Sequence, residues 1–173
     1  MLSTVNLNEC ITSSFDEAIL NGWIKCAEYL LHKHNIESMV IKHKRLNDGY
    51  EEEFLISIIK RSSDVSKVSK SKQEHAIVED AGIALGIMIT EMIRPVIMFR
   101  VLNRYDGYDY GYFSDDNDEE EFLEVTGTEK PNEGIHRLHT KIRKFKEKFP
   151  QSAGYISVSC FCEKLLIYWG HKN

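Results

Sequence analysis

The sequence predicts an α/β (α+β) domain in which helices flank a mixed sheet of four or five strands. Three observations lead to this prediction. The segment Glu74–Ile93 is apolar almost all round, so a helix there needs packing partners on more than one side. Three strand-like runs, rich in β-branched and aromatic residues, follow it. An amphipathic segment, Gly134–Phe149, and two further strand-like runs complete a chain of 173 residues, which is long enough to bury one such core.

The first part of the chain predicts a helical layer with short strands. Phe15–His34 carries apolar residues at helical spacing, and Ser14 and Glu17 form a capping box at its start. Met39–His43 is typical of a short strand. Glu52–Ile59 is a short apolar run whose pattern does not separate strand from helix.

A segment rich in serine and lysine, residues 60–74, separates this part from the core. It carries almost no apolar residues and cannot bury a face, so we expect a mobile loop. The chain therefore divides into an N-terminal part, residues 1–66, and an α/β core, residues 73–173. We expect the two to form one compact unit.

The core segments follow one another in a regular order. The helix Glu74–Ile93 ends before Pro95, and Pro150 closes the amphipathic helix. The strand-like runs are Val96–Asn103, Tyr108–Phe113, Glu121–Thr126, Gly154–Phe161 and Leu165–Trp169. A polar turn at residues 115–119 joins the second run to the third. The predicted order is helix, three strands, helix and two strands.

Charge is distributed unevenly along the core. From Asp106 to Glu133 the chain is acidic and carries a single base, Lys130, whereas six bases and one acid lie between Arg137 and Lys148. An acidic surface suits a protein partner better than a nucleic acid, because it repels phosphate unless a metal neutralises it. The basic helix could contact a phosphate backbone. Its bases alternate with apolar residues, however, which is the pattern of an ordinary half-buried helix.

Cysteine and histidine usage indicates no zinc site. The spacing of Cys10, Cys26, Cys160 and Cys162 matches no zinc or redox motif, so we expect buried free thiols in a cytoplasmic protein. His32 and His34 are expected only to complement the dipole of the first helix, and His136 and His139 to lie on the surface. No apolar run is long enough to span a membrane, and the N-terminus has no signal-peptide pattern, so we expect no membrane association.

The stretches HAIVEDAG, YDYGYF and FLEVTGTEK, in this order of elements, carry a resemblance. The segment from Gln73 to about Trp169 resembles the core of the PD-(D/E)XK, or restriction-endonuclease-like, superfamily. The same stretches are similar to small uncharacterised bacterial proteins. The superfamily implies two acids that bind Mg²⁺ or Mn²⁺, an acid on the first helix and a lysine two residues after the second acid, with no organic cofactor.

Carried over by position, the resemblance implies a set of site residues. Asp109 takes the first metal-binding acid, Glu124 the second and Glu79 the helix acid, with Asp106 as the competitor of Asp109. Thr126 stands where the pattern has lysine, so the positive charge has to come from the following helix, from Lys141 or Lys144. The implied function is a nuclease-like protein that acts on or binds nucleic acid in bacterial defence or conflict.

A second interpretation stays open for the same residues. Glu124 is then an ordinary strand glutamate paired with a lysine of the next helix, and the tyrosines around Asp109 simply pack. The chain would be a non-catalytic protein-interaction module that kept the fold and lost the lysine, such as an inhibitor, an immunity protein or a complex subunit. In this case the partner is a protein.

The two interpretations share one geometric prediction. A hairpin that turns at residues 115–119 places Asp109 opposite Glu124 and both carboxylates on one face of the sheet. Two negative charges so close repel each other. The pair therefore needs a metal ion, a basic side chain from the following helix, or a raised pKa.

Overall fold

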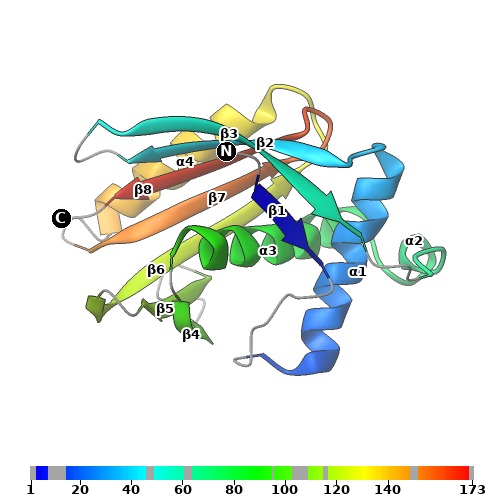
Figure 1. Ribbon diagram of the computed structural model, residues 1–173, viewed down its shortest axis with the longest axis horizontal. Coiled ribbons are helices and arrows are strands. Elements are labelled where there is room, and N and C mark those ends of the chain that lie inside the picture. Colours follow the sequence, from blue (N-terminus) through cyan, green and yellow to red (C-terminus); the bar gives the residue numbers. More distant parts are fainter. Residues whose placement is uncertain are drawn as a thin grey trace.

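The described residues of the computed structural model form eight strands and four helices around one mixed sheet (Figure 1). They are residues 3–7, 15–45, 49–60, 64–94, 96–102, 109–114, 117–148 and 152–171. The strands are β1 (Ser3–Asn6), β2 (Ser38–Arg45), β3 (Glu51–Ile59), β4 (Val96–Val101), β5 (Tyr110–Ser114), β6 (Asn117–Thr128), β7 (Gly154–Cys160) and β8 (Leu165–His171). The helices are α1 (Glu17–Lys33), α2 (Val68–Ser71), α3 (Glu74–Ile93) and α4 (Glu133–Lys148).

The strand order in the sheet is β1-β3-β2-β8-β7-β6-β5-β4. Strands β4, β5 and β6 form an antiparallel meander, and α4 then crosses over to β7, which is parallel to β6. The predicted α/β class is confirmed, but the sheet is larger than the predicted four or five strands. The N-terminal strands join it through β2, which pairs in parallel with β8.

Helices cover both faces of this sheet. The main core lies on one face, where α1 and α3 pack on residues such as Ile41, Leu123 and Tyr168. On the other face, Leu138 and Phe145 of α4 pack with Ile156 and its neighbours. Residues of the inner strands alternate between the two cores, because successive side chains of a strand point to opposite faces.

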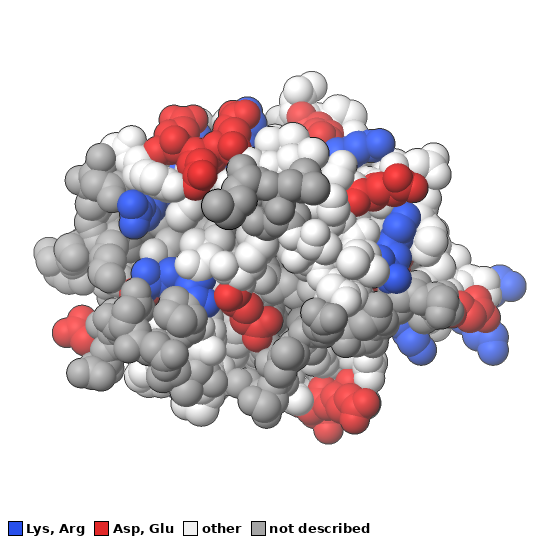
Figure 2. Space-filling view, in the orientation of Figure 1, with Lys and Arg blue, Asp and Glu red and all other residues white. Residues whose placement is uncertain are grey.

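Helix α4 covers only part of its face. Strands β2 and β3 lie beyond it, and Leu55 of β3 is 43% exposed. Ion pairs such as Lys42–Glu53 and Lys44–Glu51 join these two strands. In the view of Figure 2, the described acidic and basic side chains lie in small separate groups and form no continuous basic surface.

Two short elements differ from the sequence prediction. Strand β1 was not predicted, because its four residues, STVN, hold one apolar side chain. The prediction of a mobile loop over residues 60–74 is wrong in part, because this segment contains α2. Val68 of α2 is buried, and the nearby Val65 packs on the main core. Two valines three residues apart are enough to anchor one helical turn.

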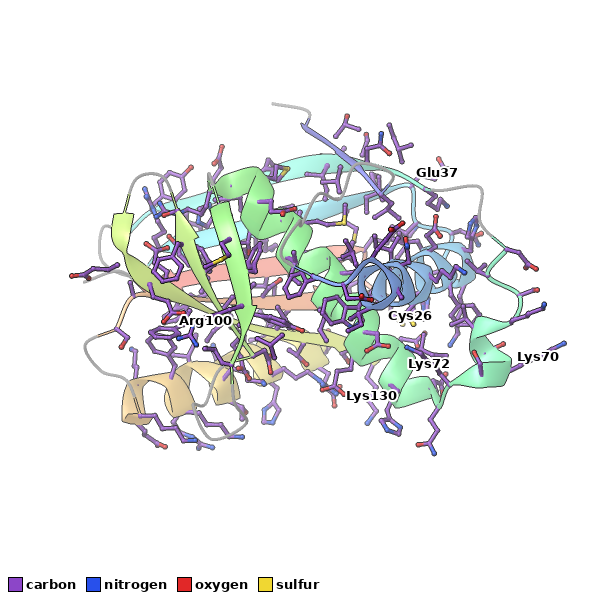
Figure 3. The ribbon with its side chains drawn as sticks, turned by 90° about the horizontal axis from the view of Figure 1, so that it is seen from below. Cys26, Glu37, Lys70, Lys72, Arg100 and Lys130 are labelled. Carbon is purple, nitrogen blue, oxygen red and sulfur yellow. The ribbon has the colours of Figure 1, made fainter. Side chains whose placement is uncertain are left out.

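The segment after α2 is fixed to the helical layer by charge. Lys72 forms an ion pair with Asp80 of α3, which also accepts a hydrogen bond from the Cys26 thiol of α1. Figure 3 shows Cys26 and Lys72 on adjoining elements. These two contacts leave Asp80 half-buried.

The start of α1 also differs in detail. Asp16 caps the helix, because its Oδ1 accepts hydrogen bonds from the backbone N–H groups of Ala18 and Ile19 at 2.9 and 3.3 Å. The predicted cap, Ser14, lies outside the described residues. An aspartate at this position also complements the positive end of the helix dipole.

Helix α3 and strand β6 are in backbone contact. A Cβ atom added at Gly82 of α3 would lie 2.7 Å from the backbone nitrogen of Gly127 and 2.8 Å from the carbonyl carbon of Thr126. Glycine at residue 82 therefore lets the helix approach the strand more closely than any side chain permits. This contact fixes the height of α3 on the carboxyl-terminal half of β6.

We predict that Gly82→Ala lowers the free energy of unfolding by about 1–3 kcal/mol, because the added methyl group meets backbone atoms that have no room to move. Gly22→Ala is the matched control in α1, where a Cβ would meet no atom within 4 Å. There we expect a gain of roughly 0.5–1 kcal/mol from the better helix propensity of alanine. Urea unfolding of both variants measures the difference, and equal effects would contradict the close approach.

Candidate functional site

The carboxyl-terminal half of β6 extends beyond β5. Tyr112 pairs with Glu121 and Tyr110 with Leu123, so Asp109, one residue before β5, stands opposite Glu124. Tyr110 and Leu123 face the core under α3, which places Asp109 and Glu124 on the α4 face. The predicted register of the hairpin is confirmed.

Glu124 forms an ion pair with Lys141 of α4. The glutamate side chain is 13% exposed and the lysine side chain 29% exposed. Burial and the Asp109 carboxylate raise the pKa of Glu124, whereas Lys141 and the more distant Lys144 lower it, and the net result is a pKa of about 7. A basic side chain from the following helix and a raised pKa thus act together on this pair.

Asp109 has a backbone partner as well as a charged neighbour. Its Oδ2 accepts a hydrogen bond from the backbone N–H of Val125 at 2.9 Å. Val125 lies beyond Leu123, the last residue of β6 that pairs with β5. The Asp109 side chain therefore accepts a hydrogen bond from a backbone N–H group that no β5 carbonyl pairs with. This contact orients the Asp109 carboxylate toward β6.

Thr126, the residue at the lysine position of the superfamily pattern, faces another cation. The Arg137 guanidinium of α4 donates a hydrogen bond to the Thr126 hydroxyl at 3.2 Å and pairs with Glu133 at 3.0 Å. Sequence reasoning missed this role of Arg137. Helical spacing could have predicted it, because residue 137 lies one helical turn before Lys141 and so on the same side of α4.

Glu79 does not join Lys141. It is exposed on α3, whose buried residues pack on the opposite face of the sheet. It lines a pocket of about 570 Å³ at the end of β6 together with Thr126 and Arg137, but Asp109 and Glu124 do not line this pocket. The structure therefore brings together three of the four predicted site residues. Asp106 lies outside the described residues.

The remaining sequence candidates fall into clear positions. Tyr110 and Tyr112 are buried, as the packing interpretation expected, whereas Tyr105 and Tyr108 lie outside the described residues. Cys26 and Cys160 are buried free thiols, but Cys162 is exposed in the turn between β7 and β8, so the prediction of a buried thiol is wrong there. Cys10 lies outside the described residues.

The described part of the chain holds no group of three or more histidine, cysteine, aspartate or glutamate side chains arranged to hold a metal ion. No helix in that part is long and apolar enough to cross a membrane. Comparisons of the chain with protein-family models, with curated proteins and with solved structures found no match in any of the three.

We predict that the raised pKa of Glu124 makes stability depend on pH. The folded protein holds the Glu124 proton up to about pH 7, whereas the unfolded chain releases it near the ordinary value of 4.5. The free energy of unfolding should therefore fall as pH rises between these values, by about 3 kcal/mol, and level off above pH 7. Glu124→Gln should remove this part of the fall.

The measurement is urea unfolding of both proteins at several pH values. Glu91 also has a pKa raised to about 7, by burial, but it titrates in both proteins and cancels in the difference. Parallel pH profiles of the wild type and the variant would show that Glu124 has an ordinary pKa.

Proposed function

We propose that the chain is a nuclease-like protein whose site is formed by Asp109, Glu124 and Lys141. The observation that carries the proposal is their convergence on one face of β6: two carboxylates from adjacent strands and a lysine from the following helix. The elements that supply them follow the order of the superfamily that the sequence resembles, α3, the β4–β6 meander, α4 and β7. A carboxyl group whose pKa is shifted by burial and by a charged neighbour, as that of Glu124 is, is typical of functional sites.

The two carboxylates fit a divalent cation of the magnesium type. Mg²⁺ is commonly held by one or two carboxylates, with water and substrate phosphate completing its coordination. Asp109 and Glu124 supply such donors. Burial, and after it the Asp109 carboxylate, raises the pKa of Glu124, and a bound cation would offset both effects. Mg²⁺ or Mn²⁺ held there would polarise a phosphate oxygen and lower the pKa of a bound water.

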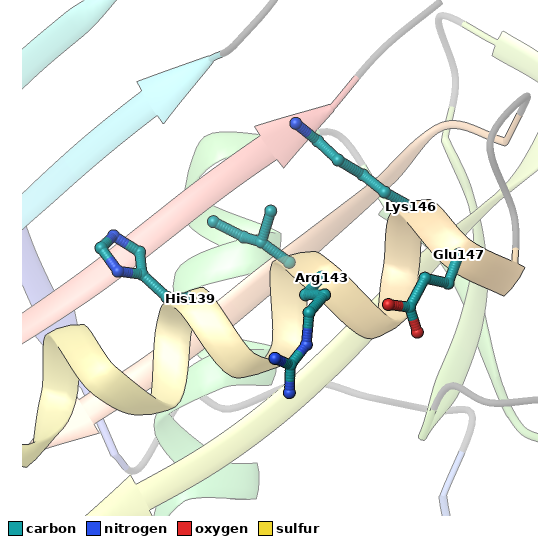
Figure 4. Close-up of a pocket in the computed structure, with 5 residues that line it drawn as sticks. His139, Arg143, Lys146 and Glu147 are labelled. Carbon is teal, nitrogen blue, oxygen red and sulfur yellow. The ribbon is translucent and has the colours of Figure 1, made fainter.

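The basic side chains of α4 would bind and orient the phosphodiester. Lys141 can place its positive charge beside the phosphate, and Arg137 offers N–H donors one turn away. The outer side of the same helix carries His139, Arg143 and Lys146 around a shallow pocket (Figure 4). These bases suit the backbone of a nucleic acid. We place this activity in bacterial defence or conflict, as the resemblance implies, and in the cytoplasm, as the cysteine usage of the sequence suggests.

A second function, a non-catalytic protein-interaction module, is favoured by a specific observation. Both carboxylates already have partners within the fold, Lys141 for Glu124 and the Val125 N–H for Asp109. Glu79 lies exposed on α3, away from Lys141, so the three predicted acids are not drawn together. On this alternative, the pair serves only to join β5, β6 and α4.

Metal binding separates the two functions. We predict that Mg²⁺ or Mn²⁺ at millimolar concentration raises the melting temperature, because an ion that binds only the folded protein stabilises it. At a concentration about 100-fold above Kd the gain is about 2.7 kcal/mol, or roughly 5–10 °C for a domain of this size. The shift should be lost in Glu124→Ala and kept in Glu119→Gln, which removes an exposed acid of the same strand.

If neither ion changes the melting temperature of the wild type, the nuclease proposal fails and the interaction module takes its place. A shift that persists in Glu124→Ala would locate the metal elsewhere and would also overturn the proposed site.

A companion prediction concerns Lys141. Lys141→Met removes the ammonium group that competes with a metal for Glu124, so its metal-dependent rise in melting temperature should exceed that of the wild type. Cleavage of single-stranded and double-stranded DNA and of RNA, with Mn²⁺ present, should nevertheless fall by about tenfold or more, because the charge beside the phosphate is lost. Asp109→Asn should abolish cleavage. Unchanged cleavage in Lys141→Met would remove lysine from the mechanism.

A further inference from the structure

Three side chains from separate parts of the chain meet at the carboxyl-terminal end of β6. His34 caps the end of α1, Glu129 follows β6 directly, and Cys162 lies in the turn between β7 and β8. The Cys162 sulfur lies 4.0 Å from Nδ1 of His34, and Nε2 of the same ring lies 2.6 Å from a carboxylate oxygen of Glu129. A thiol, an imidazole and a carboxylate in this sequence of contacts form the arrangement of an activated nucleophile.

Several contacts hold the cluster in place. The Cys162 thiol donates a hydrogen bond to the backbone carbonyl of Glu129, so its S–H bond has to rotate toward Nδ1 of His34 before the proton can be transferred. The Phe161 N–H donates to the carbonyl of Thr128 at 3.0 Å. Lys164 donates from its ammonium group to the carbonyl of Asn35 at 3.1 Å. These bonds attach the β7–β8 turn to the ends of both β6 and α1. The three side chains are therefore positioned by packed elements.

Glu129 supplies a negative charge directly beside the His34 imidazole. Burial raises the pKa of Glu129, but hydrogen bonds from Lys33 and His34 lower it more, so the net pKa is below the ordinary value and the carboxylate is ionised at neutral pH. With the Nε2 proton bonded to Glu129, Nδ1 is left to accept a proton from the thiol. The ionised carboxylate then stabilises the imidazolium that forms.

Cys26 and Cys160 differ from Cys162 because both are buried. Burial raises the pKa of Cys26 to about 11 and that of Cys160 to about 12. Cys162 is exposed and has the imidazole beside it. A pocket of about 570 Å³ is lined by His34, Glu129 and Lys130, the last of which is labelled in Figure 3. Cys162 does not line this pocket, and its exposed thiol is reached from solvent.

We propose that Cys162, His34 and Glu129 form a nucleophilic thiol centre that attacks the carbonyl carbon of an ester or thioester. The thiol proton passes to Nδ1 of His34, the sulfur–carbon bond forms, and the carbonyl electron pair moves to oxygen. As the carbonyl re-forms, the bond to the alcohol or thiol leaving group breaks, and the leaving group takes the proton from His34. Water, activated by the same imidazole, then hydrolyses the S-acyl group and restores the thiol.

The first test is the alkylation rate of each cysteine with iodoacetamide at pH 7, followed by peptide mass spectrometry. We expect Cys162 to react at least about tenfold faster than free cysteine, and His34→Ala to remove this enhancement, as general-base assistance requires. Cys26 and Cys160 serve as slow internal references. His32→Ala is the matched control, because it removes an exposed imidazole of the same helix end and should leave the rate unchanged.

The role of Glu129 is tested by the pH dependence of that rate. Glu129→Gln should move the alkylation of Cys162 to higher pH, since the imidazolium loses its carboxylate partner. Glu163→Gln makes the same change of charge next to Cys162 and should move the profile less. The charged groups around the cluster are Lys33 of α1, Glu74 of α3, Glu129 and Lys130 after β6, and Glu163 and Lys164 of the turn.

The acyl-transfer step is tested with 4-nitrophenyl acetate. Mixing with the wild type should release nitrophenolate and leave an acetyl group on Cys162, detected by mass spectrometry, and Cys162→Ser or His34→Ala should abolish both. The proposal is overturned if Cys162 is alkylated no faster than free cysteine, if His34→Ala leaves its rate unchanged, or if no acetyl group is found on it. All measurements are made with EDTA present, so their failure leaves the proposed metal-dependent site untouched.

Discussion

The backbone contact between Gly82 of α3 and Gly127 of β6 is the constraint on which the rest of the structure depends. It holds the carboxyl-terminal half of β6 against the main core on one face, which leaves its other face to α4. Because β6 has twelve residues and β5 only five, this half of the strand also extends past its neighbour. Asp109 reaches Val125 across that step, and the chain leaves the strand at Glu129. The positions of the Asp109–Glu124 pair and of Glu129 in the thiol cluster therefore follow from where β6 is fixed and where β5 ends.

The acidity of β6 is neutralised within the fold. Glu121 is fully buried and pairs with Arg94 and the Tyr112 hydroxyl on the α3 side. Glu124 pairs with Lys141 on the α4 side, and Glu129 pairs with Lys33 and His34 beyond the end of the strand. A buried carboxylate without such a partner would cost several kcal/mol, so each acid is matched to a base from a different element. Among the described residues, these three acids of the acidic segment are thus paired within the fold, which weakens the argument from charge for a protein partner.

Local patterns predicted the elements that local physics decides. The bounds of α3 follow from its apolar run and from Pro95, and the Asp109–Glu124 register follows from the position of one polar turn. Strand β1 could not be predicted in the same way, because its single valine becomes a strand only when β3 offers a parallel edge. The contact of Arg137 with Thr126 was within reach of helical spacing. The cluster of His34, Glu129 and Cys162 was not, since it joins residues 34, 129 and 162 through the parallel pairing of β2 with β8.

The topology explains why chemistry-bearing side chains gather at one end of β6. Strands β6 and β7 are parallel and are joined by α4, so their carboxyl ends lie at the same edge of the sheet. In sheets of this kind, ligands bind outside the carboxyl ends of the strands, where loops leave a crevice and helices present their first turns. Glu129 follows β6, Cys162 follows β7, and Glu133 and Arg137 belong to the first turns of α4. Strands β8 and β2 are antiparallel to this pair and therefore begin at the same edge, which brings in His34 just before β2. The candidate pocket lies where four chain segments enter or leave the sheet, the place where a fold can vary its side chains without disturbing its core.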